Sequence, residues 1–452
     1  MGRGEHLVRA DRGFATGGGL LARLLAPAWS RVLDQIDQRL KVGGIDITLP
    51  DGSPRKLGFD RPGPSAAVQL NSWMALVRLA TSGSVGWYKA WTLGEWSSPD
   101  TVALFELFSA NSAELGATAR AKGPFRWANA LAHRLRDNAP AKARDNIAAH
   151  YDLGNDFYAA WLDETMTYSS ALFRSAEETF VLSGGLSPKS KGAGTTAEQS
   201  PFDFAQDERA NGSLEQAQLT KIHTLLDRLN LKRGDRLLEI GCGWGTLAIE
   251  AAKRGATVVG LTLSTEQKTW ADRKIAEAGL SDRIEIRLQD YRETDERFDA
   301  IASVEMVEAV GERWWGTYLE CIARNLKPGG RAALQFICIR PELFSRYARS
   351  ADFIQTYIFP GGMLLNEPQF TALAEERGLS WHDRSPSMRL DYAQTLKAWR
   401  ERYDAAVAAG ALKGFTDEFH DLWRYYLMYC EGGFRGGAID VAQVTLTKTA
   451  SS

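Results

Sequence analysis

Three alternate glycines, Gly241, Gly243 and Gly245, directly follow the apolar run RLLEI and precede the helical stretch TLAIEAAKRG. A strand that ends in such a turn lets the main chain approach a ligand closely, because glycine has no side chain in the way. Glu239 stands two residues before the turn, where its carboxylate can accept hydrogen bonds from that ligand. The pattern predicts a cofactor loop at the end of a strand.

The spacing of these glycines excludes two common nucleotide loops. A dinucleotide fingerprint needs its third glycine one residue later, where Thr246 stands, and the chain has no Gly-Lys-Ser/Thr sequence for a nucleoside triphosphate. The preceding strand, the following helix and Glu239 suit the first motif of S-adenosylmethionine-dependent methyltransferases. The next strand run ends in Thr262-Leu263-Ser264 without an acidic residue, so the ribose must be held by other side chains.

The elements around this loop alternate between strand and helix signals. The strand runs are RLLEIG, TVVGLTL, RIEIRLQD, FDAIASV, RAALQFICI and a final IDVAQVTLTK, and helical stretches lie around Tyr318 to Leu326 and Leu412 to Cys430. Such alternation indicates a parallel sheet with helices on both faces. We expect an α/β fold, a Rossmann-like class I S-adenosylmethionine methyltransferase domain over residues 141–452.

The first part of the chain is different in character. Helical stretches at Arg31 to Leu40, Ala67 to Thr81 and Thr101 to Leu115 predict a mostly helical N-terminal domain over residues 1–140. Between them lies a tryptophan-rich segment, SGSVGWYKAWTLGEWSSPD. Its aromatic rings form either a buried cluster or a surface that meets lipid, since amphipathic rings favour the boundary between membrane and water.

The net charge of −2 hides an asymmetry between the two parts. Residues 1–150 carry 19 Lys and Arg against 13 Asp and Glu, and the remainder carries 35 against 43. A basic segment with helical apolar spacing, TARAKGPFRWANALAHRLRDNAPAKARDN, ends the first part. It is either a solvated helix that packs on the next domain or a helix that rests on anionic headgroups.

Two further features bound the class of protein. Residues 183–213 are rich in Gly, Ser and Pro and predict a mobile insertion without chemistry. The four cysteines lie far apart with no C-x-x-C pair, which predicts reduced thiols and argues against a zinc site. No stretch resembles a secretory signal or a spanning helix, and we expect a cytoplasmic protein.

Several motifs in a fixed order resemble the cyclopropane fatty acid synthase family. They are HYDLGNDFYAAWLDETMTYSSALF, LLEIGCGWGTLAIEAA, VVGLTLSTEQ, LQDYR, VEMVEAVG, IFPGGMLLNE and EGGFRGGAIDV. The resemblance covers the chain from about Ala67 to its end, except for the insertion. It implies methyl transfer from S-adenosylmethionine to the double bond of an unsaturated acyl chain in a membrane phospholipid. It also implies an N-terminal domain that engages an anionic membrane surface, peripheral attachment to the inner face of the cytoplasmic membrane, and a homodimer.

The resemblance also assigns cofactor-binding residues. Tyr168 and Ser169 of TYSS would touch the cofactor, together with Gly241 of the turn. Thr262, Leu263 and Gln267 of TLSTEQ would do so as well, and Asp290 and Tyr291 of QDYR would frame the adenine. Each of these residues has a purely structural alternative, such as closing a strand or packing in the core.

An alkene is a weak nucleophile, so the chemistry needs a dry site that aligns the two reactants. Methyl addition leaves a carbocation, which aromatic faces stabilise. Ring closure then needs a base, and in the family this is a bicarbonate ion held by a small polar cluster. Without a placed base, the cation shifts a hydride and loses a proton elsewhere, which gives a methyl or methylene branch.

This chain departs from the family in that cluster. Ser170 replaces a cysteine and Gln335 replaces a histidine, whereas Glu308, Ile337 and Tyr392 match. Serine and glutamine still donate hydrogen bonds, so bicarbonate binding stays open, but imidazole is lost as a cationic partner. The residue after Glu308 is Ala309, and this pattern also resembles members that install methyl branches.

We therefore expect a cyclopropane product, with a mid-chain methyl- or methylene-branched chain as the alternative. A lipid-binding relative without activity is a second alternative, which the intact cofactor motifs oppose. Nucleic acid is excluded as a substrate, because no base-reading module is present and the basic excess is small.

Overall fold

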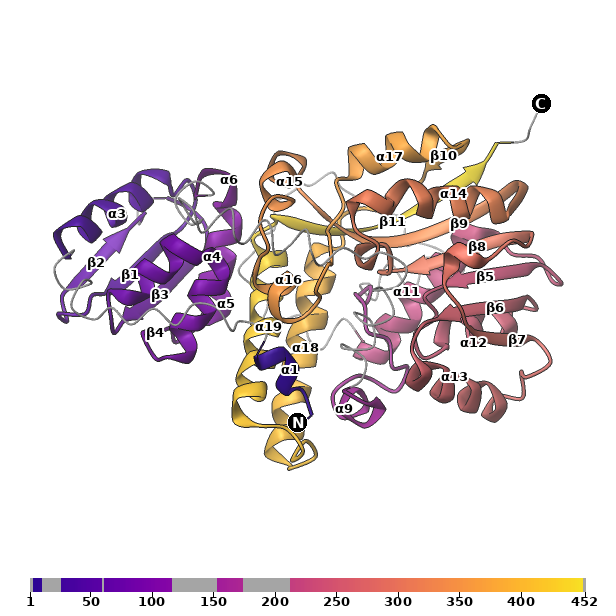
Figure 1. Ribbon diagram of the computed structural model, residues 1–452, viewed down its shortest axis with the longest axis horizontal. Coiled ribbons are helices and arrows are strands. Elements are labelled where there is room, and N and C mark those ends of the chain that lie inside the picture. The colour runs from indigo at the N-terminus through magenta and orange to yellow at the C-terminus, as the bar shows by residue number, and fades with distance from the viewer. Residues whose placement is uncertain (1–2, 10–25, 59–60, 116–152, 174–211, 450–452) are drawn as a thin grey trace, which may run out of the picture.

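The computed structural model describes residues 3–9, 26–58, 61–115, 153–173 and 212–449. Two units lie on either side of a pair of long helices, α18 (Arg389–Ala408) and α19 (Asp417–Arg435) (Figure 1). The N-terminal unit packs against α19, and the larger unit carries the central sheet. We describe the larger unit first, because it contains the predicted cofactor loop.

The larger unit is built on a seven-stranded sheet with the order β10-β11-β9-β8-β5-β6-β7. Its strands are β5 (Arg236–Ile240), β6 (Thr257–Thr262), β7 (Ile284–Leu288), β8 (Phe298–Val304), β9 (Leu326–Ile339), β10 (Leu379–His382) and β11 (Ile439–Lys448). β5 to β9 are parallel, and β11 and β10 add antiparallel pairs at one edge. The six strand runs read from the sequence and the α/β fold are confirmed.

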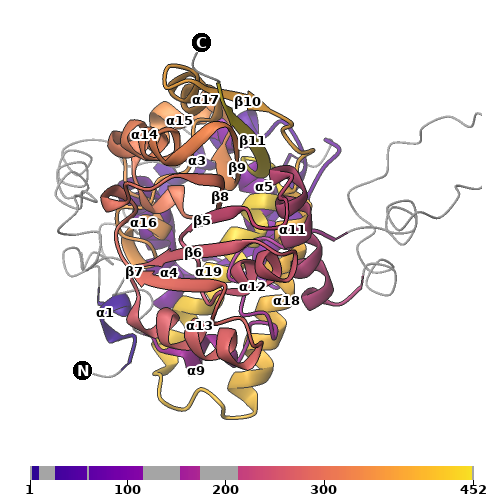
Figure 2. The ribbon, with the colours of Figure 1, turned by 90° about the vertical axis from the view of Figure 1, so that its right-hand side faces the viewer.

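Both faces of this sheet are covered, as Figure 2 shows. Leu237 of β5 packs in a core with α11 (Leu214–Leu229), α12 (Thr246–Lys253) and α13 (Thr265–Glu277). The next residue, Leu238, packs in a second core with α14 (Trp315–Asn325) and α17 (Glu367–Glu375). Because successive side chains of a strand point to opposite faces, a strand apolar at consecutive positions is stable only between two helical layers.

The strand order places a ligand site at one edge of the sheet. β5 lies between β8 and β6, so the connections that follow β5 and β8 leave in opposite directions. In open parallel sheets, ligands bind outside the carboxyl ends of the strands at such a switch point. Glu239 is the last residue but one of β5 and Glu305 follows β8, so both carboxylates belong to this edge.

The N-terminal unit contains a sheet that the sequence did not predict. Four short strands have the order β2-β1-β3-β4: β1 (Gly44–Thr48), β2 (Pro54–Leu57), β3 (Ser65–Leu70) and β4 (Trp96–Ser97). The helices are α3 (Ala26–Arg39), α4 (Met74–Thr92), α5 (Thr101–Ala110) and α6 (Ser112–Leu115). Most residues in the helices and strands of this unit are helical, as expected. Helix α3 confirms the predicted helix at Arg31 to Leu40, and α5 with α6 confirms the one at Thr101 to Leu115.

The predicted helix from Ala67 to Thr81 is wrong over its first part. Residues 65–70 form β3, and α4 begins only at Met74. Alanine, glutamine and leucine favour a helix by propensity, but Ala66, Val68 and Leu70 alternate inward beside β1. Pairing with β1, about 20 residues earlier in the chain, therefore overrides the local preference.

The tryptophan-rich segment forms a buried cluster. Trp87 and Trp96 stack with ring centroids 4.4 Å apart, and the Trp96 indole donates a hydrogen bond to the Trp87 carbonyl. Tyr88 lies with its ring centroid 4.9 Å from those of Tyr357 and Tyr425. Of the four aromatic side chains of the segment, Trp87, Tyr88 and Trp96 are almost fully buried and Trp91 is partly buried, so the structure favours the packing alternative over a lipid-facing surface for the first three.

Glycines of α19 let the N-terminal unit dock closely. A methyl group on Gly432 would lie 2.7 Å from the carbonyl oxygen of Val102 in α5, and one on Gly436 would lie 2.5 Å from the Ser109 side chain. These distances are shorter than any real contact of such atoms. The glycines of the EGGFRGG motif thus allow two helix backbones to touch.

Three expectations from the sequence concern residues outside the ranges that the structure describes. They are the basic segment around residues 117–146, the boundary between residues 140 and 141, and nearly all of the insertion at 183–213. Within the described ranges, no helix is long and apolar enough to cross a bilayer. All four cysteines are unpaired, and three of them are buried.

Candidate functional site

The glycine turn lies where the sequence predicted it, between β5 and α12. Gly241, Gly243 and Gly245 have φ values of 81°, 53° and 93°, a region that favours glycine. The turn is held to β6, since the Gly241 and Cys242 amides both donate to the Leu261 carbonyl, at 3.0 and 2.9 Å. The main chain between β5 and α12 is thereby shaped into a cradle at the carboxyl edge of the sheet.

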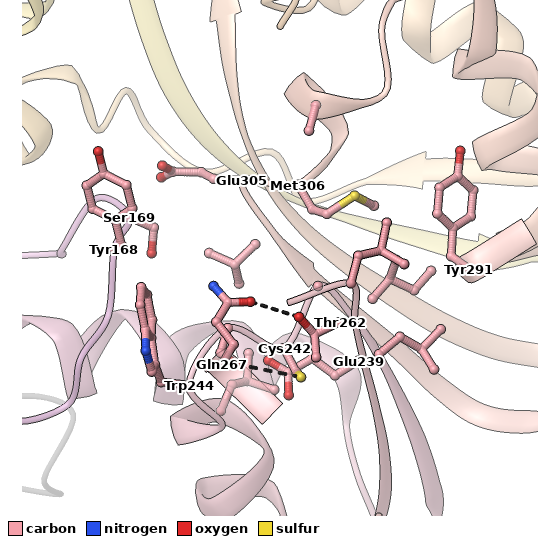
Figure 3. Close-up of a pocket in the computed structure, with 18 of the residues that line it drawn as sticks. Tyr168, Ser169, Glu239, Cys242, Trp244, Thr262, Gln267, Tyr291, Glu305 and Met306 are labelled. Carbon is pink, nitrogen blue, oxygen red and sulfur yellow. Dashed lines mark hydrogen bonds between the residues drawn. The ribbon is translucent and has the colours of Figure 1, made fainter. Parts of the chain in front are cut away.

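A pocket opens above this cradle (Figure 3). Ten of the eleven residues expected to contact the cofactor line it: Tyr168, Ser169, Glu239, Gly241, Gly243, Thr262, Leu263, Gln267, Asp290 and Tyr291. Gly245 is not part of the lining. Its role is in packing, because a methyl group there would lie 3.0 Å from the Ala271 side chain of α13.

Glu239 is buried beneath the turn, and its Oε2 atom has no hydrogen-bond partner among the described residues. Burial raises the pKa of this carboxyl well above its usual range. A buried acceptor without a partner is costly, so its presence beside a pocket indicates a ligand that supplies a donor. The ammonium group and ribose hydroxyls of S-adenosylmethionine are such donors, and the cradle fits this cofactor.

The side chains at the end of β6 hold one another in place. The Thr262 hydroxyl donates to Gln267 Oε1 at 2.8 Å, and the Ser264 hydroxyl caps α13 by accepting from the Gln267 amide. The side-chain amide nitrogen of Gln267 is therefore a donor that can face a ribose, where many methyltransferases use an acid. Asp290 is held differently, because both of its carboxylate oxygens accept from Arg292.

The opposite wall contains a buried cation that the sequence did not single out. Lys221 of α11 is fully buried and donates to the Ser169 hydroxyl at 2.6 Å. Burial lowers the pKa of Lys221 to about 8, while the nearby carboxylates of Glu305 and Asp163 counteract this shift. A charged lysine at this depth needs a negative partner.

The predicted catalytic cluster assembles around a residue that we had not predicted, Glu305. Its Oε1 accepts from the Ser170 amide at 2.9 Å and from the Gln335 side chain at 2.8 Å, and its Oε2 accepts from the Tyr392 hydroxyl at 2.9 Å. The Ser170 hydroxyl itself turns to the Ala171 carbonyl. Figure 3 shows the Glu305 carboxylate directed toward Tyr168 and Ser169.

The orientation of Gln335 follows from its neighbour across the sheet. Gln443 of β11 pairs with Gln335 of β9 and donates to its Oε1 at 3.0 Å. The side-chain amide nitrogen of Gln335 must then point to Glu305. The main chain also holds these two residues together, because the Glu305 main-chain amide donates to the Gln335 carbonyl. Glu305 is thus fixed as an acceptor of three hydrogen bonds.

Glu308 and Ile337, the other two predicted members, form a separate contact behind Glu305. The Ile337 amide donates to Glu308 Oε1, and Oε2 of Glu308 has no partner among the described residues. Burial and the charge of Glu305 raise the pKa of Glu308 to about 8. Glu305 accepts three hydrogen bonds and lies near the Lys221 ammonium, so a negative charge on the pair is better stabilised on Glu305 than on Glu308.

Replacing Glu308 with glutamine should remove the loss of stability that the wild type shows as pH rises. The carboxyl has a pKa near 8 when folded and near 4.5 when unfolded, so the folded state binds more protons between these values and the free energy of unfolding falls as pH rises. Glutamine keeps the acceptor for Ile337 but does not titrate. Urea unfolding should show E308Q gaining stability over the wild type from about pH 5 to 8, and a constant difference would contradict the assignment.

Sequence signals for the two unpredicted residues did exist. Lys221 lies on the apolar face of its helix, among Leu214, Ala217, Ile222 and Leu225. A cation is costly to bury there unless it has a negative partner. Glu305 directly follows the strand FDAIASV, at the edge where parallel strands present their ligands. Neither signal shows which groups Lys221 and Glu305 contact.

Comparison with known proteins agrees with this geometry. The family described as mycolic acid cyclopropane synthetase matches residues 138–183 and 197–444. Tuberculostearic acid methyltransferase UfaA1 of Mycobacterium tuberculosis is 36% identical over 376 residues, which are 82% of this chain and 80% of that protein. Cyclopropane-fatty-acyl-phospholipid synthase of Escherichia coli is 33% identical over 71% of this chain and 75% of its own length.

A solved structure is also similar. The mycolic acid cyclopropane synthase CmaA1, complexed with SAH and CTAB, aligns with a TM-score of 0.56 and 30% identity, over 68% of this chain and 98% of its own. The residues that the family model matches, 138–183 and 197–444, contain the whole cofactor pocket and the Glu305 cluster. These similarities support a methyltransferase fold and its cofactor.

Proposed function

This chain belongs to the mycolic acid cyclopropane synthetase family, and on that basis we propose that it methylates the double bond of an unsaturated acyl chain in a membrane phospholipid. It is an S-adenosylmethionine-dependent methyltransferase, as its relatives are. One observation carries the proposal for the substrate. Between the glycine turn and Glu305 the pocket is walled by the aromatic and apolar side chains of Tyr168, Trp244 and Met306, which suit an acyl chain.

The residues of the pocket have separable tasks. Glu239, the glycine turn and Gln267 would hold the cofactor at its two polar ends, and Asp290 and Tyr291 would lie at the adenine. When bound, S-adenosylmethionine supplies an electrophilic methyl group. Tyr168, Trp244 and Met306 line the wall between the turn and Glu305, where they exclude water and where the aromatic faces can stabilise a cation on the acyl chain.

We further propose a methylene-branched product. Two observations favour it over a cyclopropane ring. One relative, which aligns with 82% of this chain, is named for tuberculostearic acid, a methyl-branched fatty acid. In addition, Gln335 and Tyr392, two of the side chains expected to hold a free bicarbonate ion, donate to Glu305 here, as does the Ser170 main-chain amide.

The product test uses purified protein, vesicles of an oleoyl phospholipid and S-adenosylmethionine with a trideuterated methyl group. The lipid should gain one carbon with two deuterons, because the third is lost as a deuteron; mass spectrometry should give this mass, and deuterium nuclear magnetic resonance should show vinylidene signals. Cyclopropane signals would replace the branched proposal by the ring. Recovery of unmodified acyl chains would contradict the proposed substrate.

Membrane association is the second part of the proposal. The first 150 residues carry an excess of six positive charges, and each cation near an anionic surface contributes about 1 kcal/mol. Binding to vesicles with phosphatidylglycerol should weaken several-fold between 50 and 300 mM salt, by the screening expected of such contacts, and neutral vesicles should bind less. Salt-independent cosedimentation would contradict an electrostatic surface.

A further inference from the structure

Glu305 combines three features that are costly to maintain. Its backbone has a φ of 47°, in the left-handed region that a side chain disfavours by about 1 kcal/mol. Its carboxylate is enclosed by protein while one side faces the pocket, and burial raises its pKa. Strained, enclosed acids of this kind cluster at functional sites, where the surrounding structure maintains them.

The surroundings nevertheless favour the charged form of Glu305. Three donors, the Ser170 amide, the Gln335 amide and the Tyr392 hydroxyl, point at its two oxygens. The Lys221 ammonium supplies the opposite charge from α11 and lowers the pKa of Glu305, against the effect of burial. A negative charge is less well stabilised on the next acid along the chain, Glu308, whose pKa is raised to about 8.

We propose that Glu305 is the general base of the reaction and that this enzyme needs no free anion. The inference rests on the proposed function. When a methyl group is added to an acyl double bond, the methyl–sulfur bond breaks with its electron pair left on sulfur, and the π pair of the alkene forms the new carbon–carbon bond. The neighbouring carbon becomes cationic.

For a methylene branch, the hydrogen on the newly methylated carbon shifts as hydride to the cationic carbon, which moves the positive charge to the branched carbon, and a C–H bond of the new methyl group then breaks. Its electron pair forms the new double bond, or the ring bond if a ring closes, and its proton goes to a Glu305 oxygen. The resulting carboxylic acid loses this proton before the next turnover. Lys221 and the three donors favour that loss, because they stabilise the anion that it restores.

The geometry also explains why an external anion is unnecessary. The Ser170 amide, Gln335 and Tyr392 already donate to a carboxylate that the chain itself supplies. A free anion in the same place would meet the charge of Glu305 at close range, with one lysine to offset two negative charges. Removing the Glu305 side chain should therefore create a vacancy for a small anion.

The test compares E305Q and E305G with the wild type. Glycine suits the left-handed backbone, so E305G relieves backbone strain that offsets part of the loss of the Glu305 carboxylate beside Lys221. Both variants should bind S-adenosylmethionine within about threefold of the wild type in calorimetry, and turnover should fall at least 100-fold, the usual range for loss of a general base. Sodium formate or bicarbonate should restore a large part of E305G turnover and none of E305Q turnover.

A second arm measures the anion position without catalysis. Formate should bind to E305G in a calorimetric titration and should not bind to the wild type. Asn230 has the same left-handed backbone, with φ of 52°, on the exposed end of α11. N230G is therefore the matched control, and it should neither bind formate nor change turnover.

Three results would overturn the inference while leaving the proposed function intact. They are E305Q activity above about a tenth of the wild type, loss of wild-type activity when bicarbonate is removed by degassing, and formate binding to the wild type. Failure of the wild type to modify any unsaturated phospholipid would instead refute the proposed function. The two failures are thus distinguishable in one set of samples.

Discussion

Replacing Tyr392 with phenylalanine should lower turnover by about 10- to 150-fold while leaving the affinity for S-adenosylmethionine within about threefold. The Tyr392 hydroxyl donates to Glu305 Oε2 at 2.9 Å from α18, and a hydrogen bond to a charged group contributes about 1.5–3 kcal/mol. Tyr392 does not line the pocket, so the effect should appear in kcat more than in binding.

The pH profile of Y392F gives a second measurement. The hydrogen bond lowers the pKa of Glu305, so its loss should raise that pKa, and the acidic limb of the kcat profile should move to higher pH. The groups that also face this carboxylate, Lys221 from α11 and the acid of Glu308, are unchanged in the variant.

Tyr425 provides the control for this prediction. It lies on α19, is fully buried like its neighbours, and has a hydroxyl without a hydrogen-bond partner among the described residues. Y425F should leave turnover unchanged and should be neutral or slightly stabilising, because it removes a buried polar group without a partner. Equal losses in Y392F and Y425F would mean that the first variant acts through packing alone.

Replacing Gly432 with alanine should destabilise the docking of the N-terminal unit. The new methyl group would lie 2.7 Å from the Val102 carbonyl oxygen, and neither backbone can move without separating α5 from α19. Overpacking of this kind costs about 1–3 kcal/mol. Urea unfolding of the full chain should show this loss, with earlier proteolysis at the junction between the units.

Gly433 is the matched control on the same helix. A methyl group there would lie 3.3 Å from the tip of the Ile439 side chain, which can move. Alanine is a better helix former than glycine by about 1 kcal/mol, so G433A should be neutral or stabilising. Opposite signs for adjacent substitutions would show close backbone contact, and equal effects would contradict it.

The sequence was most informative where structure is local. The cofactor loop consists of an apolar strand, a turn with three glycines and a helix, which follow one another in the chain. Each of these elements can be recognised from consecutive residues. The same holds for most strands of the larger sheet, whose apolar runs need two covering layers. The short strands β1 to β4 escaped prediction, because four to six residues of mixed propensity become a strand only when a partner is beside them.

The polar cluster shows the same limit at the level of single residues. Ser170, Gln335 and Tyr392 were identified by motif, but their common partner was not. Ser170 contributes its main-chain amide rather than its hydroxyl, and Tyr392 reaches the site from a helix 87 residues further along the chain. Which donors meet a given carboxylate is a property of packing, so composition and spacing do not contain it.

By itself, the sequence determined the methyltransferase fold, the cofactor loop and the family, because each depends on residues close together in the chain. Only the tertiary structure decided that the carboxylate at the centre of the site is Glu305, which accepts three hydrogen bonds and lies near Lys221. The physical reason is that the charge of a buried acid depends on its burial and on the donors and cations around it, and here these come from four segments distant in the sequence.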